Sequence, residues 1–245
     1  MQASKSSMKQ ATALGSSASK SATTPAPDRG MISPGAFVAV AEKNGLIGAM
    51  TDRTLTLALK QIAAWTAVGL HVKMSVNLSA YMLVDVDLPD RVVREAAQFG
   101  IDPQQLILEV TETGLFQDVA NSLEILARLS MKGFSLSIDD FGTGYSSMEQ
   151  LSRIPFTELK VDRAFVHRAA ENSTAKAILK SSVDLGRKLG MTVVAEGAET
   201  QEDWDLLRNA GVDLVQGYFI ARPMAAEDVQ TWSAAWVARQ KPELT

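Results

Sequence analysis

Polar and charged residues stand at the carboxyl end of every strand that the sequence predicts. In parallel α/β folds the active site is built at these strand ends, where side chains from several strands meet at one rim. One polar strand end would be unremarkable, but a succession of them predicts a site. The residues are Asn77, Glu109 with Glu112, Asp139 with Asp140, Lys160 with Asp162, Glu196 with Glu199, and Gln216.

The chemistry that this rim predicts is metal-assisted hydrolysis of a phosphate ester. Converging carboxylates repel one another and raise one another's pKa values, and one or two divalent cations relieve that repulsion. Two cations about 4 Å apart would clamp a phosphodiester and activate a water between them. Lys160 adds a positive charge that can face a phosphate oxygen or the attacking water. We therefore expect a hydrolase that forms no covalent intermediate.

Most of these residues also have a structural explanation. The explanations are a cap of the next helix or turn for Asn77, Asp139 and Asp140, a salt bridge for Glu109, a surface ion pair for Lys160 and Asp162, and an acidic first helical turn for Glu199. The loop after Asp140 favours the functional interpretation. Its glycines, Gly142 and Gly144, allow positive φ and let a loop close over a ligand.

Short β-rich runs alternate with amphipathic helical stretches from Gly30 onward, which predicts parallel strands with helices outside. A closed barrel of this kind needs eight strands. Six are recognisable, so the pattern predicts an α/β fold, either a barrel that lacks its first two strands or an open doubly wound sheet. Periodicity alone does not separate the two, although the glycine fingerprint of a Rossmann fold is absent. The expected strands are 73–79, 106–111, 134–139, 158–162, 192–196 and 214–219, and the expected helices include 35–44, 51–68, 119–132, 174–189 and 226–239.

Composition limits the kind of site and the partners. The 245 residues include no cysteine and only two histidines, so a metal site must depend on carboxylate and amide oxygens. Such ligands favour magnesium, manganese or calcium. The net charge of −4 and the lack of a basic face argue against a large nucleic-acid partner. The sequence has no apolar run long enough to span a membrane and no signal-peptide core, so we expect a cytoplasmic chain that does not associate with a membrane.

The first residues differ in composition from the rest of the chain. Residues 1–30 are rich in Ser, Ala, Thr and Lys, and no acidic residue precedes Asp28. Such a segment has too little apolar surface to offset the entropy of ordering it. We expect a disordered, low-complexity tail over 1–30, followed by one barrel domain over 31–245 that is incomplete at its N-terminus.

A nine-residue segment, Asp139-Asp-Phe-Gly-Thr-Gly-Tyr-Ser-Ser147, resembles the DDFGTGYSS loop of EAL-domain cyclic di-GMP phosphodiesterases. The segment from Ser33 to Ile47 also resembles the family, and the similarity covers roughly residues 31–235. Further matching motifs follow in the family's order, and they are Val76-Asn-Leu-Ser79, Leu108-Glu-Val-Thr-Glu-Thr113, Leu159-Lys-Val-Asp-Arg163, Val194-Ala-Glu-Gly-Ala-Glu199, Val215-Gln-Gly-Tyr-Phe219 and Arg222-Pro-Met224.

This resemblance implies a modified TIM barrel, here lacking its first two strands, that hydrolyses cyclic di-GMP to the linear dinucleotide pGpG. It also implies Mg²⁺ or Mn²⁺ in a two-metal site, and a homodimer of the kind common in the family. The implied metal ligands are Asn77, Glu109 and Asp139 for the first cation and Asp140 for the second. Lys160 would order the nucleophilic water, and Glu196 would be a metal ligand or the general base. Glu112 would steady the loop formed by Phe141, Gly142, Thr143 and Gly144. Support of the substrate or of the metal ligands would come from Asp162, Glu199 and Gln216.

The chain departs from the family at one motif. The Glu-Ala-Leu-x-Arg segment should lie just before Ser33, where this sequence has Thr23-Thr-Pro-Ala-Pro-Asp-Arg-Gly30. In the family, the glutamate of that segment binds metal and its arginine contacts a substrate phosphate. Three functions therefore stay open: an active phosphodiesterase of impaired activity, a catalytically inactive cyclic di-GMP-binding or protein-interaction module, and a chain that needs a partner to cover its open edge.

Overall fold

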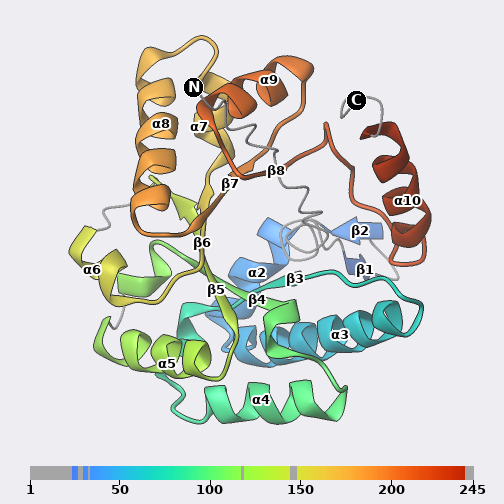
Figure 1. Cartoon of the computed structure of the whole chain (residues 1–245). Helices are drawn as coiled ribbons and strands as arrows, with labels where there is room; N and C mark the ends of the chain where they lie inside the picture. Colours follow the sequence, from blue (N-terminus) through green and yellow to red (C-terminus); the bar gives the residue numbers. More distant parts are fainter. Residues whose placement is uncertain (1–23, 27–29, 33, 117–118, 144–147, 241–245) are drawn as a thin grey trace.

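The structure is a computed structural model that describes residues 24–26, 30–32, 34–116, 119–143 and 148–240. Its centre is a six-stranded sheet in which every neighbouring pair is parallel (Figure 1). The strands are β3 (Met74–Asn77), β4 (Leu106–Thr111), β5 (Ser135–Phe141), β6 (Glu158–Val161), β7 (Thr192–Glu196) and β8 (Leu214–Gln216). All six predicted strands are confirmed, within a few residues at each end.

The strand order decides between the two predicted architectures. The strands follow one another as β3-β4-β5-β6-β7-β8, without a reversal of direction across the sheet. A doubly wound sheet contains a switch point at which the strand order reverses. A sheet that adds each new strand on the same side curls toward a barrel. The fold is therefore part of a TIM barrel, and the doubly wound alternative is excluded.

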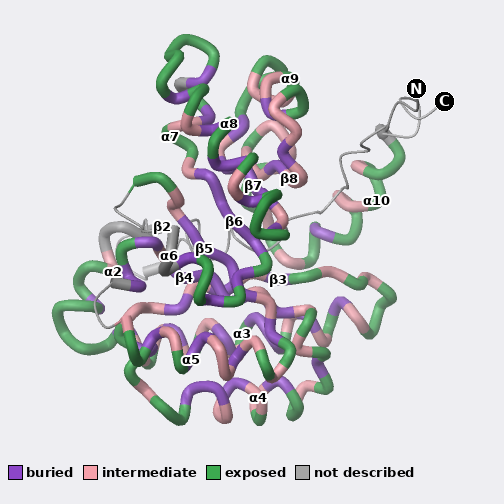
Figure 2. Tube along the Cα trace, turned by 60° about the vertical axis from the view of Figure 1, so that its left-hand side comes forward, coloured by how far each residue is buried: buried purple, intermediate pink, exposed green. Residues whose placement is uncertain are grey.

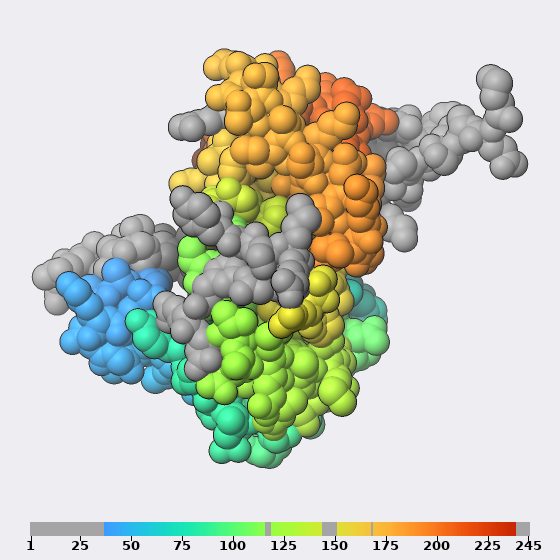
Figure 3. Space-filling model, turned by 90° about the vertical axis from the view of Figure 1, so that its left-hand side faces the viewer, coloured from blue at the N-terminus to red at the C-terminus, as the bar shows by residue number. Residues whose placement is uncertain are grey.

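Helices cover the outside of this half-barrel. α3 (Ile47–Ala67), α4 (Leu88–Gln98) and α5 (Val119–Met131) lie together, and α5 and α8 (Ser173–Lys188) share one face with α6 (Met148–Arg153) between them (Figures 1 and 3). The other helices are α2 (Pro34–Lys43), α7 (Arg163–Arg168), α9 (Gln201–Ala210) and α10 (Val229–Gln240), with 3₁₀ turns η1 (Ala80–Val84), η2 (Pro103–Gln105) and η3 (Gly114–Phe116). The five expected helices are present with similar bounds.

Local sequence explains where several helices begin. The side chain of Asn172 accepts hydrogen bonds from the amides of Thr174 and Ala175, and so caps α8. α9 begins with a capping box in which Thr200 and Asp203 each accept a bond from the other's amide. These bonds satisfy amides that have no partner inside the helix.

A small antiparallel pair precedes the barrel strands. β1 (Thr24–Ala26) pairs with β2 (Gly30–Ile32) in the register Thr24 to Ile32. The sequence predicted a disordered tail as far as residue 30, whereas residues 24–26 form a strand here. The rest of the predicted tail, residues 1–23 and 27–29, lies outside the described residues.

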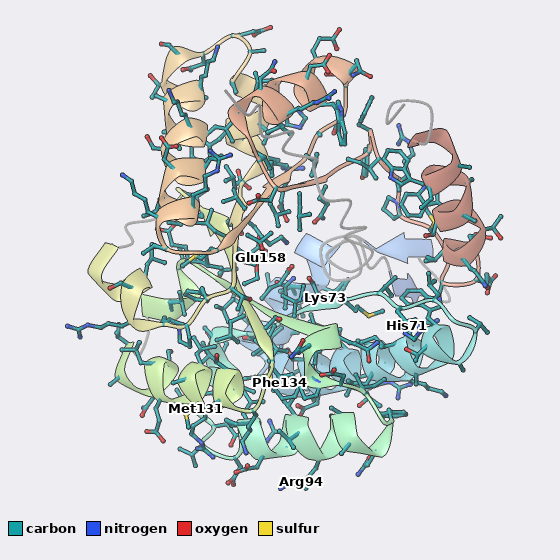
Figure 4. The ribbon with its side chains drawn as sticks, in the orientation of Figure 1. His71, Lys73, Arg94, Met131, Phe134 and Glu158 are labelled. Atoms are coloured by element: carbon teal, nitrogen blue, oxygen red, sulfur yellow. The ribbon has the colours of Figure 1, made fainter. Side chains whose placement is uncertain are left out.

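The sheet is staggered, and this stagger decides which residues share a level. Asn77 at the end of β3 pairs with Glu109, Glu109 with Ser137, and Ser137 with Glu158 at the start of β6. Such a shift in register from strand to strand is required when parallel strands curl into a barrel. Lys73, Phe134 and Glu158 mark the amino ends of β3, β5 and β6 (Figure 4).

Apolar side chains fill the space between the strands and the helices. Leu106, Leu108, Leu136, Ile138 and Leu159 have no exposed surface. Figure 2 shows buried residues along the strands and on the inward sides of α3, α4 and α5. α3 is also tied to the C-terminal part of the chain, because Trp65 Nε1–H donates to the carbonyl of Ala226 at 3.1 Å. Among the described residues, no helix has the length and apolar character to cross a membrane.

Close packing of α8 on β7 yields a stability prediction. Gly186 lies inside α8, and a Cβ added there would overlap Cγ2 of Val193, a side chain with little rotamer freedom. We expect Gly186→Ala to lower the free energy of unfolding by about 1–3 kcal/mol, the usual cost of overpacking. Urea denaturation followed by circular dichroism measures it.

The control is Gly48→Ala in α3, where an added Cβ meets nothing within 4 Å. There the free energy of unfolding should stay the same or rise, because alanine favours a helix more than glycine does. Equal effects of the two substitutions would contradict the packing argument.

Candidate active site

A buried lysine and its carboxylate partners occupy the carboxyl end of the half-barrel. Lys160 Nζ lies 2.6 Å from Glu196 Oε1, 2.9 Å from Glu109 Oε1 and 3.5 Å from Asp139 Oδ1. The exposed fraction is 1% for Lys160 and Glu109, 0% for Asp139 and 6% for Glu196. Charged groups that are taken out of water in this way need partners of opposite charge close by.

The electrostatics of the cluster follow from this burial. Burial raises the pKa of Glu109 to about 7, Asp139 adds to the rise, and Lys160 opposes it. For Lys160, burial favours the neutral amine, but Glu109, Glu196 and Asp139 together outweigh it and raise the pKa. The lysine is therefore a fixed positive charge at the centre of the cluster.

A β-bulge brings two consecutive aspartates to the same place. Ile138 of β5 pairs with Leu159 of β6, yet the next pair is Phe141 with Val161, so Asp139 and Asp140 both stand opposite Lys160. In a regular strand, neighbouring side chains point to opposite faces. Here an extra residue removes that alternation, and Asp140 takes a left-handed backbone with φ of 57°. Oxygens of Asp139, Asp140 and Glu196 consequently lie within 4.8 Å of one another.

The loop after the bulge is fastened to the end of β4. The amide of Glu112 donates to the carbonyl of Asp139 at 3.0 Å. Its carboxylate oxygen Oε2 accepts a hydrogen bond from the amide of Gly142, also at 3.0 Å. Gly142 has φ of +94°, and a Cβ there would press on the ring of Phe165. The hydrogen bond from Gly142 to Glu112 is the kind of contact that the predicted role of Glu112, steadying this loop, would require.

The other predicted loop residues differ in how far they are buried. Phe141 is half-buried and packs against the core, whereas Thr143 is exposed and donates its hydroxyl to the carbonyl of Asp140 at 2.8 Å. Gly144 lies outside the described residues.

The remaining predicted residues surround the cluster at different distances. Asn77 is the register partner of Glu109, and Gln216 is the partner of Glu196, so both stand beside it. The carbonyl of Gln216 accepts bonds from the amides of Gly197 and Ala198.

Asp162 and Glu199 belong to the periphery of the rim. Asp162 caps α7 by accepting the amide of Ala164 at 2.9 Å. The side chain of Glu199 is 53% exposed and lies 3.9 Å from His167. The structure thus brings Glu109, Asp139, Asp140, Lys160 and Glu196 together and leaves these two outside that group.

Two buried polar residues beside the cluster, Ser137 and Glu158, were not among the residues predicted from the sequence. Ser137 Oγ–H donates to Glu158 Oε1 at 2.9 Å, and both side chains are buried. Each precedes a predicted site residue by two positions, Ser137 before Asp139 and Glu158 before Lys160. Residues two apart on a strand share a face, so this spacing was the signal that could have found them.

The cluster has the composition of a divalent-cation site. Glu109, Asp139, Asp140 and Glu196 supply four carboxylates against one ammonium, which leaves a formal charge of −3 when all are ionised. Oxygen donors of this kind suit hard cations such as Mg²⁺, Mn²⁺ and Ca²⁺. The residues present therefore fit a divalent metal ion.

Comparison with known proteins identifies relatives over most of the chain. The family model described as EAL domain matches residues 22–223. The bifunctional diguanylate cyclase/cyclic di-GMP phosphodiesterase MucR of Pseudomonas aeruginosa is 42% identical over 205 residues, which is 83% of this chain and 30% of MucR. The chain thus spans about a third of the length of this relative.

Solved structures agree with the sequence comparison. The PaMucR phosphodiesterase in a c-di-GMP complex superposes with a TM-score of 0.81 at 41% identity, covering 84% of each chain. BlrP1 of Klebsiella pneumoniae, solved as a manganese/cy-diGMP complex, gives a TM-score of 0.65 at 32% identity. That alignment covers 70% of this chain and 43% of BlrP1.

The raised pKa of Glu109 predicts a specific dependence of stability on pH. The pKa of Glu109 is about 7 in the folded chain, against 4.5 for an unperturbed glutamate. The folded state binds this proton more tightly than the unfolded state does. The contribution of Glu109 to stability is therefore fully present below pH 4.5 and is lost as pH rises toward about 7.

Glu109→Gln removes this titration. In metal-free buffer with EDTA, the wild type should lose about 2–3 kcal/mol relative to Glu109→Gln between pH 4.5 and pH 7.5. Urea denaturation at a series of pH values measures the difference. Curves that run parallel over this range would show that Glu109 is not perturbed.

Proposed function

The chain belongs to the EAL domain family, and on this premise we propose that it hydrolyses cyclic di-GMP to pGpG with the help of Mg²⁺ or Mn²⁺. The observation that carries the proposal is the buried cluster of Glu109, Asp139 and Glu196 around Lys160, with the half-buried Asp140 beside Asp139 and Glu196. A cyclic dinucleotide presents two phosphodiesters, and the carboxylate-rich rim needs cations to accept such an anion.

The metal-binding part of the proposal assigns the ligands. Glu109, Asp139, Asp140 and Glu196 would hold one or two divalent cations, and Asn77 beside Glu109 would add an amide oxygen. A bound divalent cation supplies positive charge for the phosphate oxygens and lowers the pKa of a water molecule. The bulge at Asp139 and Asp140 sets the direction in which the two carboxylates approach.

The proton-handling part falls to Lys160 and Glu196. The ammonium of Lys160 stays charged, so it can donate a hydrogen bond to the attacking water or to a phosphate oxygen, and hold either in place. Glu196, 2.6 Å from Nζ, can accept the proton that the water gives up. Addition of one water across one P–O bond would yield a phosphate monoester and a free hydroxyl, which is the linear product.

A second candidate function is binding of cyclic di-GMP without turnover. The sequence observation that favours it is the missing Glu-Ala-Leu-x-Arg motif, which occurs nowhere in the 245 residues. The resemblance assigns to that motif one metal ligand and one phosphate-binding arginine. The phosphodiesterase remains the first proposal because the other matching motifs keep their acidic and basic residues.

The proposal includes a homodimer and the cytoplasmic location predicted from the sequence. The resemblance to the EAL domain family suggests the dimer, in which the loop that begins at Phe141 would take part in the interface. Light scattering of the purified chain, with and without manganese, tests the oligomeric state independently of activity.

Turnover is the direct test. The purified chain is incubated with cyclic di-GMP and Mn²⁺, and pGpG is followed by chromatography. We expect product from the wild type and a loss of about a hundredfold in Asp139→Ala, since removal of a metal ligand disables the site. Asp205→Ala, which removes an exposed acid from α9, is the matched control and should keep full activity.

The same experiment separates the two candidate functions. If the folded wild type forms no pGpG but binds cyclic di-GMP in a calorimeter, the binding module replaces the phosphodiesterase. If Asp139→Ala forms as much product as the wild type, the site assignment is wrong.

A further inference from the structure

Ser137 and Glu158 form a buried polar pair that the proposed reaction does not use. Ser137 has no exposed surface and Glu158 is 9% exposed. The hydroxyl of Ser137 donates to Glu158 Oε1 at 2.9 Å. Within the described part of the chain, Lys160 and Lys73 attract Glu158 only at longer range than an ion pair. A buried carboxylate whose close partner is a neutral hydroxyl is costly, so its position calls for an explanation.

The pair sits immediately before the bulge that builds the site. Ser137 pairs with Glu158 and Ile138 with Leu159, and then the register shifts, so that Phe141 pairs with Val161. From the pair, a step of two residues leads along β5 to Asp139 and along β6 to Lys160. The side-chain bond therefore joins β5 to β6 at the last levels where the two strands are in regular register.

The bulge needs such a fixed starting point. Asp139 and Asp140 face a single residue of β6, and Asp140 has φ of 57°, a left-handed backbone that non-glycine residues seldom adopt, although aspartate adopts it more readily than most. A slip by one residue in a parallel pair would turn each side chain to the opposite face of the sheet. An interaction that resists the slip just ahead of the bulge keeps both aspartates on the site side.

We propose that Ser137 and Glu158 are positioning residues that lock the β5–β6 register and thereby hold Asp139 and Asp140 at the rim. The lock itself is a property of the sheet, whereas its effect on metal binding rests on the proposed function. The hydrogen bond carries this role, and the negative charge does not. In agreement, burial raises the pKa of Glu158 against the opposing effects of Ser137, Lys160 and Lys73, so a neutral acceptor suits the position.

The first test measures the lock without metal. Hydrogen exchange of the full-length chain in EDTA, followed by mass spectrometry, reports on peptides that contain residues 137–143. Loss of one buried hydrogen bond should speed exchange there about fivefold to tenfold in Ser137→Ala and in Glu158→Leu. Glu158→Gln keeps an oxygen that accepts from Ser137 and should exchange like the wild type.

The second test measures the consequence at the site. In calorimetric titrations with Mn²⁺, Ser137→Ala and Glu158→Leu should bind about fivefold to tenfold more weakly than the wild type, as is usual when a group supporting metal ligands is lost. The double variant should be no weaker than the worse single variant, because both substitutions break one bond. Glu158→Gln should bind within about twofold of the wild type.

Ser182→Ala is the matched control, since it also removes a bond from a buried hydroxyl, that of Ser182 to the carbonyl of Ile178 in α8. It should change neither readout. Unchanged exchange in Ser137→Ala, or Glu158→Gln as impaired as Glu158→Leu, would overturn the lock. If Glu158→Leu does not fold, Ser137→Ala and Glu158→Gln still decide it. A wild type that binds no Mn²⁺ would refute the metal site of the proposed function, while the exchange data would still decide the lock.

Discussion

The ammonium of Lys160 among buried carboxylates is the interaction on which the rest of this structure depends. Its Nζ lies between 2.6 and 3.5 Å from carboxylate oxygens of Glu109, Asp139 and Glu196, all of which are buried. Coulomb attraction at these distances is strong because the surrounding strands exclude water. The same exclusion makes each charge costly on its own, so enclosing this rim depends on the part of its negative charge that Lys160 offsets.

Geometry of the parallel sheet converts this balance into a site. The stagger between strands brings residues from the end of β3 and the start of β6 to one level. The bulge then adds Asp140 to Asp139 on the same side. Neither feature concerns a single residue, because each is a relation between neighbouring strands. The register of β5 against β6 is therefore as important to the chemistry as the identity of the acids.

The sequence allowed much of this to be predicted, and the limits have physical causes. The strands were recognisable because buried parallel strands are short apolar runs, such as Leu106–Val110. Their polar ends pointed to Glu109, Asp139, Lys160 and Glu196. The bulge was not predictable, since an extra residue leaves the pattern of residue types unchanged. Asp162 caps α7, and a helix cap and a site residue look alike in sequence. Ser137 and Glu158 precede Asp139 and Lys160 by two positions, so a search for polar residues at strand ends does not include them.

Charge also bears on how many cations the cluster can hold. When all four carboxylates are ionised, they and Lys160 leave a formal charge of −3, so one divalent cation would bring the cluster to −1 and a second would bring it to +1. A buried site with a surplus positive charge is unfavourable until an anion enters. Under the proposed function a phosphodiester would supply that anion, so this set of acids would favour one cation before the substrate binds and a second together with it. The carboxylate of the missing Glu-Ala-Leu-x-Arg motif would shift this balance by one charge, which makes binding of the second cation the step most sensitive to its absence.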